Sequence, residues 1–485
     1  MNRINSLVLS SAIALLVTAC GGGGGSGGAP APATLAAPAS AANGQSVGAV
    51  TGFGSIFVNG IEFDTRQASF SKNGQPALEH DMKVGQIVSV TGTRSADHKT
   101  GTATQVSMKS NVEGVITNVD VKNLQITVLG QRVQLDASTV VEGATPADIN
   151  GLAKDDKVEV SGLPDANGVI LATHIEKVTT LPASLELRGV VASLDSGAKK
   201  FNIGTQVVDY SNATLVGFAT TAIAEGDKVE VRGPAPANGA ALAATRVEKE
   251  EKRVAGNEGS ESELEGLITR FVSPQDFDVA GQKVTTNDKT RFERGAAGDL
   301  KMGARVEAEG KVDASGVLVA AKIEVKAASK TRVAGKIDTL NTTDKQFTVL
   351  GQVIAVDAKT QFEDKSSAHK MPFSFADLAA NDFVVVRGVP GTGSVHILAT
   401  RVERQNADAQ TRMEVRGKVT EMTKPTFVVT GVTVTVDAKT RIEVDDKILT
   451  LDEFFAQLKV GAQIEAKGTV TGAKAITASE VETDR

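Results

Sequence analysis

The residues that recur at fixed spacing and could do chemistry are an aspartate and, three positions later, a threonine. They stand in the motif D-A-x-T at Asp136 and Thr139, Asp357 and Thr360, and Asp437 and Thr440. Their oxygens could bind a cation or contact a partner, which would make the motif a reused site. The same residue types form Asx and Ser/Thr turns, in which the carboxylate accepts a backbone hydrogen bond and ends a strand. We favour the turn, because Asn287 replaces the aspartate in a related segment and the position therefore demands no exact chemistry.

Other patterns that could hold a metal or a nucleophile are incomplete. The segments D-A-N-G at 165–168 and D-A-S-G at 313–316 resemble fragments of calcium loops, but no bidentate glutamate follows them. The five histidines form no H-x-x-x-H pair, and a Walker loop or zinc cluster is missing from the sequence. We therefore predict no catalytic residues, no cofactor, no metal site and no enzymatic activity.

The N-terminus carries a secretory pattern. Arg3 precedes an apolar run at 7–17, which is too short to span a bilayer and fits a signal peptide. The run ends in V-T-A-C, which resembles the lipobox of bacterial lipoproteins and predicts lipidation of Cys20. We predict a signal peptide at 1–19 and a flexible Gly/Pro/Ala tether at 20–46. Gly21, in place of an aspartate, favours the outer membrane.

The chain after the tether repeats a unit of about seventy residues six times. Each copy starts with a short G-x-[VIL] strand at Gly48, Gly114, Gly189, Gly266, Gly335 and Gly417. The predicted repeats span 47–109, 113–178, 187–249, 264–326, 333–404 and 415–483.

A strand, a glycine and a second strand follow in each copy. In the first copy the glycine is preceded by Asn59, and Asn-Gly between apolar strands is the strongest short hairpin signal. The aligned glycines are therefore predicted to hold the left-handed position of a two-residue turn. They are Gly60, Gly130, Gly204, Gly281, Gly351 and Gly431.

The last part of each copy predicts a short helical or 3₁₀ turn, a tight reversal, a strand closed by a glycine, and a final hairpin. The reversal residue is glycine in four copies, and Asp155 and Asn381 replace it in the others. Both replacements tolerate left-handed geometry, as a turn requires. Five or six short antiparallel strands in so few residues would leave two edge strands with unpaired backbone groups unless the sheet closed into a barrel. We predict an all-β tandem array of six small β-barrels, OB-like or SH3-like, with their stacking left open.

The composition argues against nucleic-acid binding. Of 485 residues only 4% are aromatic, with one tyrosine and no tryptophan, and the net charge is −6. Single-stranded nucleic acids are bound by stacked aromatic side chains in a basic groove, so we expect no nucleic-acid partner.

The repeats resemble the domain of unknown function 5666 family, which occurs in tandem in exported proteins of Gram-negative bacteria. The likeness is carried by GAVTGFGSIFVNGIEFDT at 48–65 and by V-x-V-x-G blocks that end at Gly92, Gly162, Gly233, Gly310, Gly388 and Gly468. The resemblance implies no activity.

The leading hypothesis is a lipid-anchored, non-enzymatic scaffold or interaction protein of the cell envelope, at the outer membrane and on a side left open. It is anchored to the membrane through Cys20 and has a protein or polysaccharide partner. The alternative is an array of polysaccharide- or peptide-binding modules, with variable loops such as 364–377 forming the contacts. An enzyme with an unrecognised site is the third hypothesis.

Overall fold

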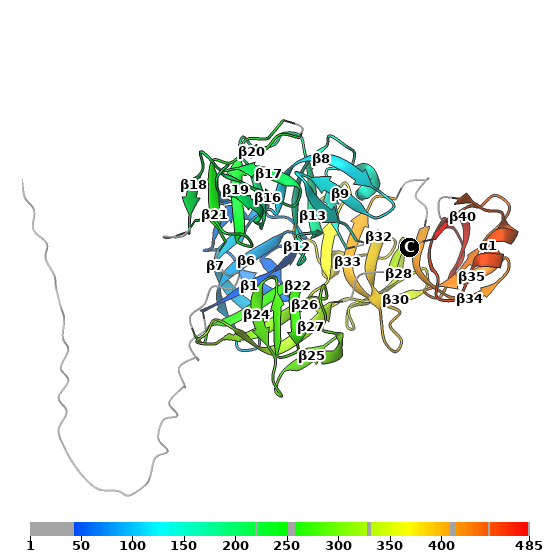
Figure 1. The fold of residues 1–485 in the computed structure, drawn as a ribbon. Helices are drawn as coiled ribbons and strands as arrows, with labels where there is room; N and C mark the ends of the chain where they lie inside the picture. The colour runs from blue at the N-terminus through cyan, green and yellow to red at the C-terminus, as the bar shows by residue number, and fades with distance from the viewer. Residues whose placement is uncertain are drawn as a thin grey trace, which may run out of the picture. The chain divides into compact units, whose positions relative to one another are not determined.

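The computed structural model describes residues 43–136, 138–218, 222–237, 239–250, 258–326, 331–407, 413–444 and 447–483. The predicted signal peptide, Cys20 and nearly all of the tether lie outside the described residues. Short β-strands dominate the described residues (Figure 1), which confirms the all-β prediction. None of the described helices is long and apolar enough to cross a membrane.

The strands fall into six modules. Module 1 contains β1 (Asn43–Gly52), β2 (Ile56–Val58), β3 (Ile61–Asp64), β4 (Ser69–Lys72), β5 (Gln75–Ala77), η1 (Glu79–Asp81), β6 (Ile87–Arg94) and β7 (Thr100–Met108). Module 2 contains β8 (Val112–Asp120), β9 (Gln125–Val128), β10 (Gln131–Gln134), β11 (Val140–Glu142), η2 (Ile149–Gly151), β12 (Lys157–Pro164) and β13 (Ile170–Val178). Module 3 contains β14 (Leu185–Val190), β15 (Ala192–Asp195), β16 (Lys200–Ile203), β17 (Gln206–Asp209), β18 (Thr214–Val216), β19 (Lys228–Gly233), β20 (Leu242–Ala243) and β21 (Arg246–Lys249).

The second half of the chain repeats this order. Module 4 contains β22 (Glu261–Ser273), β23 (Asp276–Val279), β24 (Gln282–Thr285), β25 (Arg291–Glu293), η3 (Ala297–Asp299), β26 (Arg305–Val312) and β27 (Leu318–Lys326). Module 5 contains β28 (Thr331–Asn341), β29 (Gln346–Val349), β30 (Gln352–Ala355), β31 (Gln361–Asp364), η4 (Phe375–Asp377), β32 (Phe383–Pro390) and β33 (Ile397–Gln405). Module 6 contains β34 (Met413–Thr423), β35 (Thr426–Val429), β36 (Val432–Thr435), β37 (Arg441–Val444), β38 (Lys447–Ile448), α1 (Leu451–Gln457), β39 (Gln463–Gly472) and β40 (Ala475–Thr483).

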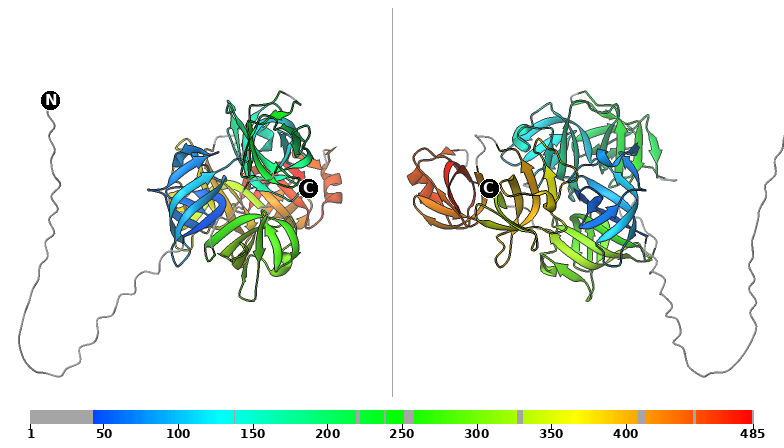
Figure 2. Two further views of the ribbon diagram at one scale, coloured as in Figure 1. Left: turned by 60° about the vertical axis from the view of Figure 1, so that its left-hand side comes forward. Right: turned by 180° about the vertical axis from the view of Figure 1, so that it is seen from behind.

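Module 4, the lower green barrel in the left view of Figure 2, shows how the closed barrels are formed. Strand β22 pairs with β23 and β26, β23 pairs with β24, and β27 pairs with β24 and β26. All of these pairings are antiparallel except β24 with β27, which is parallel. The same ring recurs in modules 1, 2, 5 and 6. Around the barrel, the neighbouring strands follow the order 1-2-3-5-4, and strands 3 and 5 are parallel. This is the arrangement of an OB-type Greek-key barrel. The structure thus decides between the OB-like and SH3-like alternatives.

Module 3 departs from the closed ring. Its first strand is interrupted between β14 and β15, and its last strand between β20 and β21. As a result β15, β16, β17 and β20 form a separate four-stranded sheet, while β14, β19, β21 and β18 join the sheet of module 2.

The modules are joined in pairs through their first strands. In module 5, residues 331–336 of β28 pair with β32 along one edge, and residues 337–341 pair with β29 along the other edge. The second edge is therefore left open at the start of the strand. Residues 332–334 use this edge to pair with 414–416 of β34. Residue 112 of β8 pairs likewise with 187 of β14, and residues 44–47 of β1 pair with 261–264 of β22. Each module contributes its first strand to one joint, so module 1 is joined to module 4, module 2 to module 3, and module 5 to module 6.

The core consists mainly of aliphatic side chains on alternating strand positions, with few rings. Phe277, Phe347 and Phe427 occupy equivalent places on the second strands of three modules and are almost fully buried. One apolar cluster spans modules 2 and 3, and another spans modules 5 and 6. Burial of apolar surface therefore holds these module pairs together in addition to the strand pairing.

Candidate functional site

The repeated aspartate and threonine form a turn in each copy that contains them. The amide of Lys359 donates to Asp357 Oδ1 at 2.9 Å, and the amide of Asp357 donates to Thr360 Oγ1 at 3.0 Å. The two other aspartates accept from the residue two positions on at 2.7 and 2.8 Å, and Asn287 does so at 2.9 Å. A neutral amide oxygen serves as well as a carboxylate, so the motif is a structural turn and not a repeated cation site.

The threonine hydroxyl also forms a long-range hydrogen bond to the last strand of the barrel. Thr360 Oγ1 donates to the carbonyl of Ala399 at 2.8 Å, and Thr290 donates to Ala320 at 2.7 Å. Strand β33 pairs with β30 up to residue 398 and with β31 from residue 401. The carbonyl of Ala399 lies in the gap between these two ladders, and the hydroxyl supplies the hydrogen bond that the backbone cannot.

The six hairpin glycines all have a left-handed backbone. Their φ values range from 57° at Gly204 to 85° at Gly60 and Gly281. In five modules the residue before the glycine also has positive φ, which gives a type I′ turn. Module 3 differs, because β16 ends at Ile203 and Gly204 is therefore the first of the two turn residues.

The glycines that close the V-x-V-x-G blocks are required by close packing. A Cβ atom at each of them would lie 2.0 to 2.4 Å from a carbonyl oxygen of the module's last strand. The strand register shifts at this glycine in modules 1, 2, 4, 5 and 6, which brings the two backbones together.

The segments that resemble calcium loops are also turns. Asp165 Oδ1 accepts hydrogen bonds from the amides of Asn167 and Val169, both at 2.8 Å, and Asp313 does the same with Ser315 and Val317. Across the described ranges no three His, Cys, Asp or Glu side chains gather as a metal site would require.

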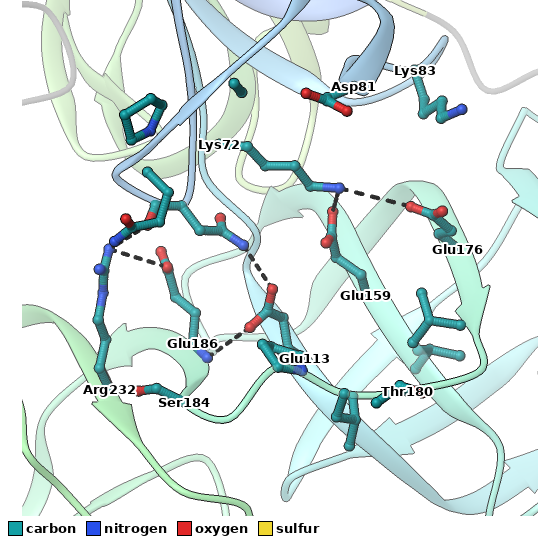
Figure 3. A pocket seen from close by; sticks show the side chains of 18 of the residues that line it. Lys72, Asp81, Lys83, Glu113, Glu159, Glu176, Thr180, Ser184, Glu186 and Arg232 are labelled. Carbon is teal, nitrogen blue, oxygen red and sulfur yellow. Dashed lines mark hydrogen bonds and ion pairs between the residues drawn. The ribbon is translucent and has the colours of Figure 1, made fainter.

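A cleft that the sequence analysis missed lies among residues of modules 1, 2 and 3. It has a volume of about 910 Å³. Module 1 contributes β4, β5 and η1 to its wall, and the segment 180–184 between modules 2 and 3 contributes another side. Glu113 on β8, Glu159 on β12 and Glu186 on β14 lie along it (Figure 3), and all three are buried.

Lys72 neutralises one half of the cleft. Its Nζ lies 3.1 Å from Glu159 Oε1 and 3.8 Å from Glu176 Oε2. Burial by itself would lower the pKa of Lys72, but the charge and hydrogen bond of Glu159 together with the charges of Glu176 and Glu113 outweigh burial and raise the pKa above its ordinary value. Lys72 therefore stays charged beside the two carboxylates.

The other half of the cleft holds carboxyl groups that are less well compensated, since the nearest cation, Arg232, lies 3.4 Å from Glu186 Oε2. Glu113 accepts from Asn73 Nδ2 at 2.7 Å and from the amide of Glu186 at 3.0 Å, and both donors are neutral. Burial and the nearby Glu159 raise the pKa of Glu113 to about 7. Burial and Glu230 raise the pKa of Glu186 to about 8. Both carboxyls thus take up protons near neutral pH, and the arrangement is suited to binding a cation.

The sequence pattern around these glutamates indicates solvent exposure, whereas the structure shows that they are buried. Glu159 lies in V-E-V and Glu186 in L-E-L, which are alternations typical of a strand with one wet face. In the structure this face is covered by a neighbouring module, so both residues are less than 10% exposed. Only the packing of modules against one another turns the pattern into a buried polar site.

Comparison with known proteins agrees with the internal repeats. The model of the family described as Domain of unknown function (DUF5666) matches the chain six times, at residues 46–107, 113–176, 188–248, 265–324, 334–403 and 416–482. Comparison with curated proteins finds no match. The six matches correspond to the six structural modules and confirm the resemblance carried by the hairpin and V-x-V-x-G segments. The chain belongs to the Domain of unknown function (DUF5666) family, as a tandem array of six copies.

Proposed function

We propose that the chain is a non-enzymatic scaffold of the cell envelope, lipid-anchored through Cys20 at the outer membrane. The observation that carries the scaffold role is the pairing of the six first strands into three joints. Such joints make a multi-module body with few open sheet edges, which suits a protein that presents loops to a partner.

Polar contacts reinforce the joints. At the β1–β22 joint the amide of Ala49 donates to Glu265 Oε2 at 3.2 Å, and at the β28–β34 joint Arg332 Nη1 lies 2.7 Å from Glu414 Oε1. Between modules 4 and 5, Lys359 Nζ lies 2.6 Å from Glu307 Oε1. Breaking a buried ion pair leaves an uncompensated charge, so these contacts oppose separation of the modules.

The anchor is tested by Cys20→Ser in cells that process lipoproteins. We expect the unsubstituted chain to be lipidated, cleaved before Cys20 and found with outer membranes. The variant should lose lipidation and leave the membrane fraction. Unchanged processing and fractionation of the variant would contradict the anchor.

The scaffold is tested by removing modules. A chain that ends at residue 406 keeps module 5 but exposes the edge of β28 that β34 covers, so we expect it to self-associate in analytical ultracentrifugation. A chain that ends at residue 326 removes modules 5 and 6 together and serves as the matched control, because its strand joints are complete. Equal behaviour of the two chains would argue against strand pairing as the joint.

A ligand-binding array is the second candidate, and the cleft among modules 1, 2 and 3 favours it. An array that binds polysaccharide or peptide at its loops predicts retention on an immobilised glycan or peptide library. If the chain is still retained after the cleft is blocked, the contacts lie in the loops.

A further inference from the structure

Glu186 is the least compensated group of the cleft. Its side chain is almost fully buried, and within the described part of the chain its Oε1 has no hydrogen-bond partner. Arg232 Nη2 lies 3.4 Å from Glu186 Oε2 but closer to Glu230 Oε1, at 2.7 Å, and it also donates to the carbonyl of Asn73. The hydrogen bond of Arg232 to Glu186 Oε2 is thus the longest of these three contacts, and Glu186 Oε1 remains available to a donor.

Charge in the cleft favours a cationic donor. The lining contains five acidic side chains, Asp81, Glu113, Glu159, Glu176 and Glu186, and four basic ones, Lys72, His80, Lys83 and Arg232. Lys72 is shared by Glu159 and Glu176, and Lys83 lies 3.7 Å from Glu142. The least compensated carboxyls are thus Glu113, whose hydrogen-bond donors are neutral, and Glu186, whose cation Arg232 is 3.4 Å away. The two are adjacent, because the amide of Glu186 donates to Glu113 (Figure 3).

The walls favour a flexible aliphatic ligand over a ring. Pro76, Ala77, Leu181 and Pro182 provide apolar surface, and the lining contains neither Phe, Tyr nor Trp. Sugars and nucleobases are commonly bound against aromatic faces, which this lining does not offer. A methylene chain needs only aliphatic contact and carries an ammonium group at its end, as a lysine side chain does.

We propose that the cleft binds a small alkylammonium compound, a diamine or polyamine. One ammonium group lies against the Glu186 carboxyl and the methylene chain lies along Leu181 and Pro182. The inference goes beyond the scaffold role and does not depend on the lipid anchor.

Binding should release protons. Glu186 is faced by Glu113 from β8, by Glu230 and Arg232 from β19 and by Arg188 on its own strand. Its raised pKa means that the free cleft holds a proton near neutral pH, and an arriving ammonium favours the charged carboxylate. Titration calorimetry in two buffers of different ionisation enthalpy measures the proton count.

The test is calorimetry of the full-length chain with spermidine and with 1,5-diaminopentane at pH 7 and low salt. We expect both amines to bind and pentane-1,5-diol to give no heat. Glu186→Gln should weaken amine binding at least tenfold and abolish proton release. Thr180→Trp, at an exposed position on the rim, should also weaken binding, because the ring fills the cleft without touching the buried groups.

Glu263→Gln is the matched control. Glu263 on β22 is as buried as Glu186 and its pKa is also raised to about 8 by burial and by Glu307, but it does not line the cleft. Its substitution should leave amine affinity unchanged. The proposal is overturned by absence of amine binding, by equal affinity of Glu186→Gln and the unsubstituted chain, or by an equal loss in Glu263→Gln. A blocked lysine peptide that binds more tightly than either amine would identify a protein partner instead and would also overturn it.

Discussion

Thr360 Oγ1 donates a hydrogen bond to the carbonyl of Ala399, 39 residues along the chain, at 2.8 Å. The hydroxyl fills the gap in the ladder between β30 and β31 on the last strand of module 5. The equivalent bonds of Thr139, Thr290 and Thr440 span 2.7 to 2.9 Å. The repeated threonine is therefore explained by a long-range contact of the barrel and needs no ligand.

Removing this hydroxyl should destabilise the barrel. Thr360→Val keeps the shape of the side chain but leaves a buried carbonyl without its donor, and we expect a loss of about 1 to 3 kcal/mol in the free energy of unfolding. Denaturation by guanidinium chloride, followed by circular dichroism, measures the change. Thr360→Ser retains the hydroxyl and should lose less. Equal stability of the two variants would show that the hydrogen bond contributes nothing.

Lys359 should matter to the contact between modules 4 and 5. Its Nζ pairs with Glu307 and Glu324, both buried on module 4. Lys359→Ala removes one of the two cations beside each carboxylate, because Lys326 also pairs with Glu307 and Arg294 with Glu324. We therefore expect a loss of about 1.5 to 3 kcal/mol, as for a hydrogen bond to a charged group. Lys439→Ala is the matched control, because Lys439 holds the same place in module 6 and is exposed. Similar stability of the two variants in thermal unfolding would contradict the contact.

Gly310 should not tolerate a side chain. An alanine Cβ at this position would lie 2.0 Å from the carbonyl oxygen of Val319, which forces the two strands apart. We expect Gly310→Ala to cost about 1 to 3 kcal/mol, as overpacking does. Gly298→Ala, in the same module, meets no atom within 4 Å and should change stability by less than about 0.5 kcal/mol. Urea unfolding of both variants checks the difference, and a neutral Gly310→Ala would argue against the close strand approach.

His174 should make the fold sensitive to acid. Burial lowers the pKa of His174 to about 3, while its ordinary value is 6.5. Between these values the unfolded chain binds a proton that the folded chain does not, so the free energy of unfolding decreases as pH falls from 6.5. The expected loss is roughly 1 to 2 kcal/mol between pH 6.5 and 5.

The comparison with His174→Asn isolates this contribution. Asparagine can still donate to the carbonyl of Val84, which lies 2.8 Å from His174 Nδ1, but it does not titrate. Unfolding measured from pH 5 to 8 should therefore show a weaker decline in acid for the variant. His80→Asn, at an exposed position, serves as the control and should follow the unsubstituted chain. Parallel curves for His174→Asn and the unsubstituted chain would contradict the prediction.

The sequence by itself determined the local architecture. The Asn59-Gly60 pair and its aligned glycines predicted the hairpins, and Asp155 and Asn381, with φ of 73° and 71°, occupy left-handed reversals as turn chemistry requires. These features depend on residues close in the chain, where sterics and side-chain to backbone hydrogen bonds act directly. The six-fold repetition then fixed the number of modules, and alternation of apolar residues identified the all-β class.

Only the tertiary structure decided the barrel topology, the joints and the cleft. The parallel closure of β24 against β27 depends on two strands separated by more than thirty residues, and no local pattern records which strands meet. Glu113 and Glu186 look like ordinary wet-face residues in the sequence, and they become a buried polar site because neighbouring modules cover them. Alternation shows which side of a strand is apolar, but the burial of a charged side depends on contacts between distant segments.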